Sequence, residues 1–163
     1  MVKWKLKKAV KEDEHIIREL FIEMLQAIYM TENVNGYEEG YLDKFFNGGD
    51  DWICVAETDG KVVAYLSIEV YRGQEEYIYL DDLSVSEKYR GNGIGTELIK
   101  AAERFAREIN IPVVFFHVEK SNILAFELYK RLGYSVMKEE GTRFGMIKKY
   151  SWQDSTHNYW FYM

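Results

Sequence analysis

The chain has 163 residues, 47% of them apolar and 16% aromatic, which is enough to bury one substantial core. No stretch approaches the ~20 apolar residues that span a bilayer, so we expect an unexported, cytoplasmic protein without a membrane partner. The net charge of −6 is uneven: residues 1–11 carry +5, residues 12–87 carry −15 and residues 88–163 carry +4. The acidic middle argues against nucleic acid and for a cationic partner.

The first half of the chain predicts one strand, two helices and three further strands. Apolar residues from Ile16 to Ile28 follow a helical spacing after Asp13, a candidate N-cap. Asp59-Gly60 is a strong hairpin signal between two strands, and Cys54 in the first of these is expected to be a buried thiol. The predicted segments are 3–9 (strand), 13–28 and 38–46 (helices), and 52–58, 61–71 and 77–85 (strands).

The second half alternates helices and strands. Apolar residues at helical spacing begin at Ile94, and a later helix ends at Gly133. The predicted segments are 94–109 (helix), 112–118 (strand), 122–132 (helix) and 142–150 (strand). This order indicates a mixed α/β sheet with helices on its faces, in a single domain of residues 1–163 made of parts 1–50, 51–110 and 111–163. The aromatic tail 151–163 is expected to pack on the domain or on a second subunit, which favours a homodimer.

A glycine-rich loop precedes the predicted helix at 94. Gly91, Gly93 and Gly95 let the backbone adopt positive φ and bring its N–H groups close to a ligand, at the positive end of a helix dipole. That combination suits a phosphate. Because Gly95 is followed directly by Thr96, the loop fits neither a P-loop nor the dinucleotide fingerprint G-x-G-x-x-G.

Two spaced motifs resemble the GCN5-related N-acetyltransferase (GNAT) family. Residues 90–95 match the signature R/Q-x-x-G-x-G/A, and residues 122–134 match N-x-x-A-x-x-x-Y-x-x-x-G-F/Y. The resemblance implies the fold of that family, with a mostly antiparallel sheet, a parallel pair at the cofactor cleft and acetyl-CoA as the donor, without a metal. The residues it assigns to acetyl-CoA are Leu83, Ser84, Val85, Arg90, Gly91, Asn92, Gly93, Ile94, Gly95, Thr96 and Asn122.

The strand before the loop shows a change of phase. Ile78 and Leu80 alternate in one phase and Leu83 and Val85 in the other, which favours a β-bulge at Asp81-Asp82 over an uninterrupted strand. In the family, such a bulge parts this strand from the next parallel strand, and backbone groups there bind the pantetheine arm. The resemblance gives that role to Leu83 and Val85, and it gives Ile94 only an amide contact, because its side chain begins the apolar stripe of the helix.

Transfer to an amine requires a base, because a lysine-like amine with a pKa of about 10.4 is mostly protonated at neutral pH. The stretch YLDDLSVSEKYRG is similar to diamine-type acetyltransferases, in which a glutamate stands at the position of Asp81. Neighbouring strand residues point to opposite faces, so one of Asp81 and Asp82 should face the acceptor. Asp81 is our candidate base, and Asp82, His117, Glu119 and a water molecule remain alternatives.

The leaving thiolate requires a proton donor, and the second motif places Tyr129 in that role. A tyrosine with a pKa near ~10 stays protonated at neutral pH, although a packed aromatic is the alternative. The sequence therefore predicts direct acetyl transfer to the primary amine of a small cationic acceptor, polyamine-like or aminoglycoside-like. A peptide N-terminus, a protein lysine and a non-catalytic acetyl-CoA-binding module remain alternatives, and the motifs do not identify the acceptor.

Overall fold

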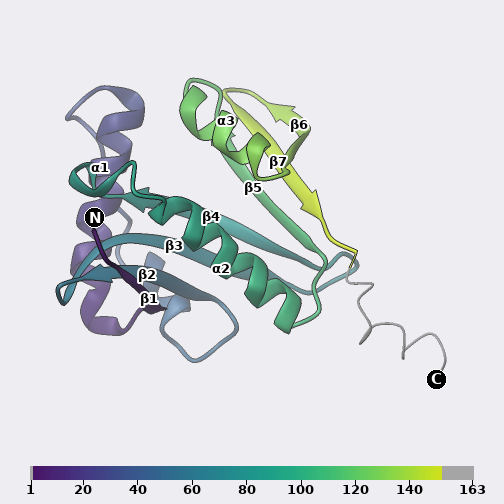
Figure 1. Cartoon of the computed structure of the whole chain (residues 1–163), viewed down its shortest axis with the longest axis horizontal. Coiled ribbons are helices and arrows are strands. Elements are labelled where there is room, and N and C mark those ends of the chain that lie inside the picture. The colour runs from purple at the N-terminus through teal and green to yellow at the C-terminus, as the bar shows by residue number, and fades with distance from the viewer. Residues whose placement is uncertain (1, 152–163) are drawn as a thin grey trace.

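The structure, a computed structural model, describes residues 2–151. They form one seven-stranded sheet in the order β1-β2-β3-β4-β5-β7-β6 (Figure 1). β4 and β5 pair in parallel, and the other neighbouring strands pair antiparallel, which confirms the predicted mixed sheet. The strands are β1 (Lys5–Lys8), β2 (Trp52–Thr58), β3 (Lys61–Tyr71), β4 (Tyr77–Val85), β5 (Val113–Glu119), β6 (Ser135–Glu140) and β7 (Arg143–Lys149).

Three α-helices lie where the periodicity predicts them: α1 (Glu14–Tyr29), α2 (Ile94–Glu108) and α3 (Ile123–Arg131). Asp13 precedes α1, but its carboxylate accepts from the amide of Val10 at 2.9 Å instead of capping the helix. The helix expected over 38–46 is only a 3-10 turn at Tyr41–Phe45. Gly40 and Gly48 flank this turn with φ of 80° and 84°, which leaves too few residues for an α-helix.

The core lies on both faces of the sheet. Along β2, Ile53 and Val55 pack in a cluster with Ile17 of α1, whereas Cys54 packs in a second cluster with Leu98 of α2. Because strand side chains alternate between faces, α1 and α2 cover opposite sides of the sheet, and α3 joins α2. Cys54 is the expected buried thiol, and burial raises its pKa to about 11.

The β2–β3 hairpin turns at Asp59 and Gly60, whose φ angles of 51° and 74° are those of the predicted tight turn. No helix within residues 2–151 is long and apolar enough to cross a membrane. The predicted packing of the aromatic tail concerns residues from 152 onward, which lie outside the described part of the chain.

Candidate functional site

β4 contains the predicted β-bulge. From Leu66 to Ile68, β3 advances two residues, while the facing stretch of β4 from Leu83 back to Leu80 takes three. The extra residue therefore lies at Asp81-Asp82, and the bulge prediction is confirmed.

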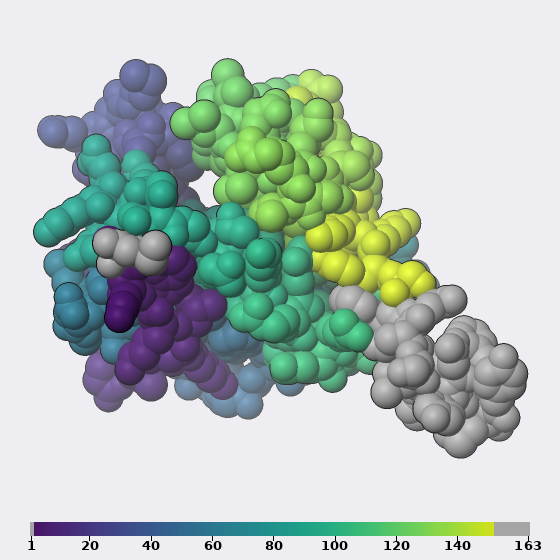
Figure 2. Space-filling view, viewed as in Figure 1, coloured from purple at the N-terminus to yellow at the C-terminus, as the bar shows by residue number. Residues whose placement is uncertain are grey.

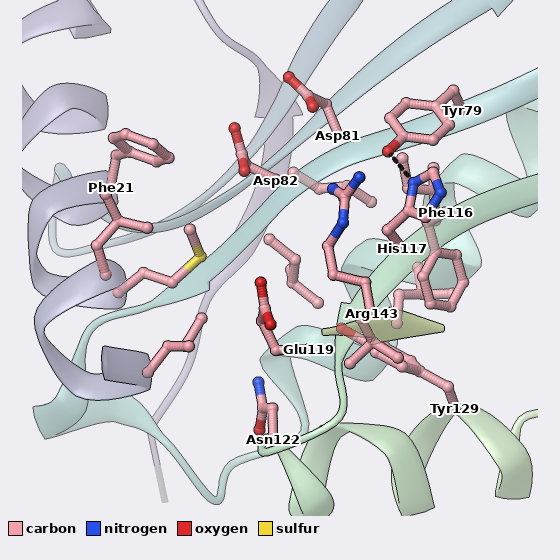
Figure 3. A pocket seen from close by; sticks show the side chains of 18 of the residues that line it. Phe21, Tyr79, Asp81, Asp82, Phe116, His117, Glu119, Asn122, Tyr129 and Arg143 are labelled. Carbon is pink, nitrogen blue, oxygen red and sulfur yellow. Dashed lines mark hydrogen bonds between the residues drawn. The ribbon is translucent and has the colours of Figure 1, made fainter. Parts of the chain in front are cut away.

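The parallel pairing of β4 with β5 ends at Leu80 and Phe116, so the edge of β4 beyond the bulge has no strand partner on that side in the described chain. A cavity of about 250 Å³ lies at this point, lined by residues of α1, β4, β5, α3 and β7. Figure 2 shows the molecular surface hollowed between the green C-terminal half and the blue and teal segments before it. Figure 3 shows the side chains that line the cavity.

Asp81 and Asp82 both line the cavity, and the expectation that they point to opposite faces is wrong. Their carboxylates lie on the same side of β4 (Figure 3). The hydroxyl of Tyr41 donates to Asp81 at 2.5 Å, and that of Tyr37 donates to Asp82 at 2.6 Å. The rings of Tyr37 and Tyr41 stack on one another, with centroids 5.0 Å apart. The bulge explains the error, because its extra residue breaks the two-residue alternation of the strand.

The turn that carries Tyr41 is fixed to β3 by an ion pair whose carboxylate is buried. Lys44 donates to Glu69 at 2.7 Å, and Glu69, only 4% exposed, also accepts from the hydroxyl of Tyr71. Breaking such a pair would leave a buried charge without compensation. The pair thereby holds Tyr41 where its hydroxyl reaches Asp81.

The environment of the two aspartates favours their protonated forms. Burial raises the pKa of Asp82, and the negative charge of Asp81 raises it further. Burial also raises the pKa of Asp81, while the hydrogen bond from Tyr41 acts in the opposite direction. A carboxylate with a raised pKa is a stronger base, so this pair is better suited than an ordinary aspartate to accept a proton near neutral pH.

The raised pKa of Asp82 predicts a pH-dependent stability. Between the ordinary aspartate pKa of about 3.9 and the raised value, the folded chain binds more protons than the unfolded chain, so stability is lost as the pH rises. Asp82→Asn removes the charge and keeps an oxygen that accepts from Tyr37. We expect the variant to melt about 1–4 °C above the parent at pH 8, with a gain that shrinks toward pH 4.

Thermal melts across this pH range test the prediction. The matched control is Asp50→Asn, because the side chain of Asp50 is 67% exposed. An Asp82→Asn variant that melts at or below the parent temperature at pH 8 would contradict the prediction.

Tyr129 projects from α3 toward the gap between β4 and β5 (Figure 3). Its ring packs edge-on against Phe116, with centroids 4.5 Å apart, so the packing expected of a core aromatic is present. Within residues 2–151 its hydroxyl has no hydrogen-bond partner, which leaves it available to a ligand. Burial raises the pKa of Tyr129 to about 12, so the hydroxyl keeps its proton at neutral pH. Its role as the acid stays a prediction.

The two weaker base candidates are held by other side chains. His117 lies between the hydroxyl of Tyr79, 2.6 Å from Nδ1, and Glu140, 2.8 Å from Nε2. Glu119 accepts from the hydroxyl of Tyr29 at 2.9 Å. Both residues line the cavity, so the assignment of the base to Asp81 stays a prediction.

Asn122 both caps α3 and lines the cavity. It precedes α3, and its side-chain oxygen accepts from the amide of Ala125 at 3.4 Å. It also lines the cavity, where its amide N–H groups have no partner in the described chain. Capping therefore leaves the donor end of the side chain free for a ligand.

The residues of β4 and of the loop after it that the resemblance assigns to acetyl-CoA differ in the hydrogen bonds that they already make. The hydroxyl of Ser84 donates to the carbonyl of Leu20 on α1, and the carbonyl of Val85 accepts from Arg90 at 2.9 Å. Leu83 lines the cavity. The guanidinium of Arg90 also lies 4.0 Å from Glu23 of α1, so its charge is shared between the loop and that helix.

The glycine loop presents a row of free amides. Gly91 and Gly93 have φ of 79° and 82°, and a Cβ added at either would meet no atom within 4 Å. The described chain offers no acceptor to the amides of Gly91, Asn92 and Gly93. The amides of residues 94–96 belong to the first turn of α2 and have no partner within the helix. The first helical hydrogen bond is donated by the amide of residue 97 to the carbonyl of Gly93.

These donors fit a pyrophosphate, which carries negative charge to a helix N-terminus. The side chain of Ile94 is 1% exposed and belongs to the core, as expected, so only its amide can take part. Within the described residues, no cluster of His, Cys, Asp and Glu could hold a metal ion.

Sequence reasoning missed three residues of the site. Tyr37 and Tyr41 lie in a segment without periodicity. Their separation by four positions is the one feature of the sequence that is consistent with the stacking of their rings. Arg143 begins β7 and reaches into the cavity from the hairpin with β6. Its position in the predicted strand 142–150 carries no signal, because the sequence does not show which strand that segment pairs with.

Comparisons with known proteins agree with this geometry. The model of the Acetyltransferase (GNAT) family matches residues 21–134. The chain is 32% identical over 130 residues to an uncharacterized N-acetyltransferase of Methanocaldococcus jannaschii, covering 79% of this chain and 76% of the relative. It is 36% identical over 120 residues to an N-alpha-acetyltransferase of Sulfurisphaera tokodaii, covering 68% of this chain and 65% of that relative.

Two solved structures share the fold. The PaiA N-acetyltransferase of Thermoplasma acidophilum, in complex with coenzyme A, has a TM-score of 0.75 at 20% identity, over 91% of this chain and 99% of the other. An aminoglycoside acetyltransferase from an uncultured soil metagenomic sample has a TM-score of 0.65 at 23% identity, over 84% of this chain and 91% of the other. At these identities the likeness concerns the fold.

Proposed function

This chain belongs to the GNAT family of acetyltransferases and is an acyltransferase that uses acetyl-CoA, and from that premise we propose that its acceptor is the primary amine of a cationic small molecule. The single observation that carries the proposal is the pair of carboxylates, Asp81 and Asp82, beside Tyr129 in one cavity.

The residues present fit acetyl-CoA. The amides of the glycine loop and of the first turn of α2 would receive its pyrophosphate, and the free edge of β4 beyond the bulge would receive the pantetheine arm. Asn122 would donate its side-chain amide to the same arm. When bound there, acetyl-CoA supplies an activated acyl group.

The cavity residues then have separate roles in a direct transfer. Asp81 accepts the proton that the acceptor ammonium must lose before its nitrogen can attack. As the new bond joins that nitrogen to the acyl carbon and the bond between this carbon and sulfur breaks, the nitrogen loses its second proton to solvent. Tyr129 donates a proton to the departing sulfur and regains one from solvent. The proton on Asp81 is released to solvent, so each turnover leaves both residues as they began.

The charges in the cavity favour a cationic acceptor. Three of its lining residues, Asp81, Asp82 and Glu119, are carboxylates, and Arg143 is the single Lys or Arg among the described residues that line it. The surrounding segment 12–87 carries −15. The negative potential of these residues concentrates cations and orients an ammonium group toward the carboxylates.

The N-terminus of a peptide is a second candidate acceptor, favoured by the name of the Sulfurisphaera tokodaii relative. A peptide would place a free α-amine at the same carboxylates. Assays on a peptide therefore belong beside those on small amines.

A salt series tests the cationic acceptor. Cadaverine and pentylamine have the same length, but only cadaverine carries a second charge. We expect kcat/KM for cadaverine to exceed that for pentylamine by at least about tenfold and to fall as salt is raised, mainly through KM, because exposed charges are screened over ~8 Å at physiological ionic strength.

A peptide with a neutral side chain at its first position serves as the third acceptor in the series. Equal rates for the two small amines, or rates that salt does not change, would show that the acidic residues only solvate the surface. A higher kcat/KM for the peptide than for either amine would overturn the small-molecule acceptor in favour of a peptide N-terminus.

A further inference from the structure

Arg143 lies in the cavity as a cation among carboxylates. It is the first residue of β7, where it pairs in register with Glu119 of β5 and Glu140 of β6. Figure 3 shows its side chain extending across the cavity, with the guanidinium group between the side chains of Asp82 and His117. Burial raises the pKa of Asp81, and the positive charge of Arg143 acts in the opposite direction, so the two groups interact across the cavity.

The guanidinium group of Arg143 has no partner within residues 2–151. No carboxylate lies within 4.0 Å of it, and it donates no hydrogen bond to a described residue. Two neighbouring cations are paired instead: Lys138 of β6 lies 2.9 Å from Glu140, and Lys120, just after β5, pairs with Glu139. Glu139 and Glu140 thus bind other cations, and the guanidinium of Arg143, an exposed residue that lines the cavity, keeps its N–H donors for a ligand or solvent.

A planar guanidinium is suited to a carboxylate, which it binds with two parallel hydrogen bonds. A cation at this place would instead repel an acceptor that is positively charged along its whole length. The cavity therefore offers two complementary kinds of group, carboxylates at Asp81-Asp82 for an ammonium and the guanidinium of Arg143 for an anionic group.

We propose that Arg143 forms a carboxylate-binding subsite and that the acceptor is an amino acid-like molecule bearing a carboxylate besides its primary amines. This inference rests on the proposed function and narrows its substrate class. In such a complex, Asp81 faces the reacting amine while the guanidinium of Arg143 holds the carboxylate, which fixes the position of the amine relative to the acyl carbon.

Matched pairs of acceptors test this subsite. Lysine, ornithine and 2,4-diaminobutyrate differ from cadaverine, putrescine and 1,3-diaminopropane only by the carboxylate. We expect the best amino acid of the three to exceed its decarboxylated counterpart in kcat/KM by at least about tenfold. Arg143→Met should remove that advantage, mainly by raising KM for the amino acid, and should leave KM for acetyl-CoA and the rate with the diamine unchanged or improved.

Two further variants separate the subsite from a general charge effect. Lys149→Met removes a cation from the other end of β7 and should change neither the rate with the amino acid nor the rate with the matching diamine. Arg143→Lys keeps the charge without the planar fork and should restore only part of the preference. Melting temperatures of all variants check that they fold.

The outcomes distinguish this inference from the proposed function. Diamines acetylated as well as the amino acids, with rates that Arg143→Met leaves alone, would overturn the subsite and leave the cationic acceptor standing. Acetylation of none of the six amines would overturn both proposals. An Arg143→Met variant whose kcat/KM falls by the same factor for an amino acid and for its decarboxylated counterpart would also overturn the subsite. Arg143 would then act only through the general electrostatic field of the cavity.

Discussion

Tyr129→Phe is expected to lower kcat by about ten- to a thousandfold while leaving the affinity for acetyl-CoA nearly unchanged. The hydroxyl faces the cavity without a partner in the described chain, and burial keeps it protonated by raising its pKa to about 12. The ring contact with Phe116 survives the substitution, so the fold should be kept. A donor that acts mainly in the transition state affects kcat, whereas binding is measured separately by titration with acetyl-CoA.

Tyr77→Phe is the matched control, because Tyr77 lies on β4 outside the set of residues that line this cavity. It should keep the turnover of the parent. Equal turnover in Tyr129→Phe and the parent would remove Tyr129 from the mechanism and leave it as a packed aromatic.

Gly93→Val is expected to weaken the binding of acetyl-CoA by at least tenfold, which corresponds to ~1.4 kcal/mol. Gly93 has φ of 82°, a conformation that a β-branched residue adopts only under strain. A Cβ at this position meets no atom of the protein, so the loss should fall on the amides that face the ligand. Isothermal titration with acetyl-CoA measures the effect.

Gly48→Val separates backbone strain from ligand binding. Gly48 has φ of 84° and equally open surroundings, but it lies far along the chain from the glycine loop. It should lower the melting temperature and leave the affinity for acetyl-CoA unchanged. Unchanged affinity in a folded Gly93→Val variant would withdraw the assignment of the phosphates to this loop.

The fold can be predicted from the sequence wherever a local pattern determines the structure. The apolar spacing from Ile94 marks α2, Asp59-Gly60 fixes the hairpin, and the phase change around Asp81 and Asp82 predicts the bulge. In each of these places the periodicity or turn chemistry agrees with the burial that the fold requires. The glycine loop also follows from its own residues, because positive φ at Gly91 and Gly93 is a local property.

The cavity itself depends on contacts between distant segments. The phase change predicts a bulge, but strand alternation still sends Asp81 and Asp82 to opposite faces, whereas the extra residue puts both carboxylates on one side. Tyr37 and Tyr41 reach these carboxylates from a segment without a repeating pattern, about 40 residues earlier in the chain. Arg143 enters from the opposite end of the sequence, and only the strand order β4-β5-β7 brings it there. Such pairings leave no periodic trace.

Direct analysis of the products tests the central claim that the chain transfers the acetyl group of acetyl-CoA to an amine. The purified protein is incubated with acetyl-CoA and each acceptor of the amine and peptide panel, and free CoA thiol and N-acetylated product are quantified by mass spectrometry. We predict one CoA released for each N-acetylated acceptor, with Tyr129→Phe slower by the factor given above. Acetyl-CoA that binds but yields no acetylated amine with any acceptor, or an acetyl group found on the protein itself, would contradict direct transfer.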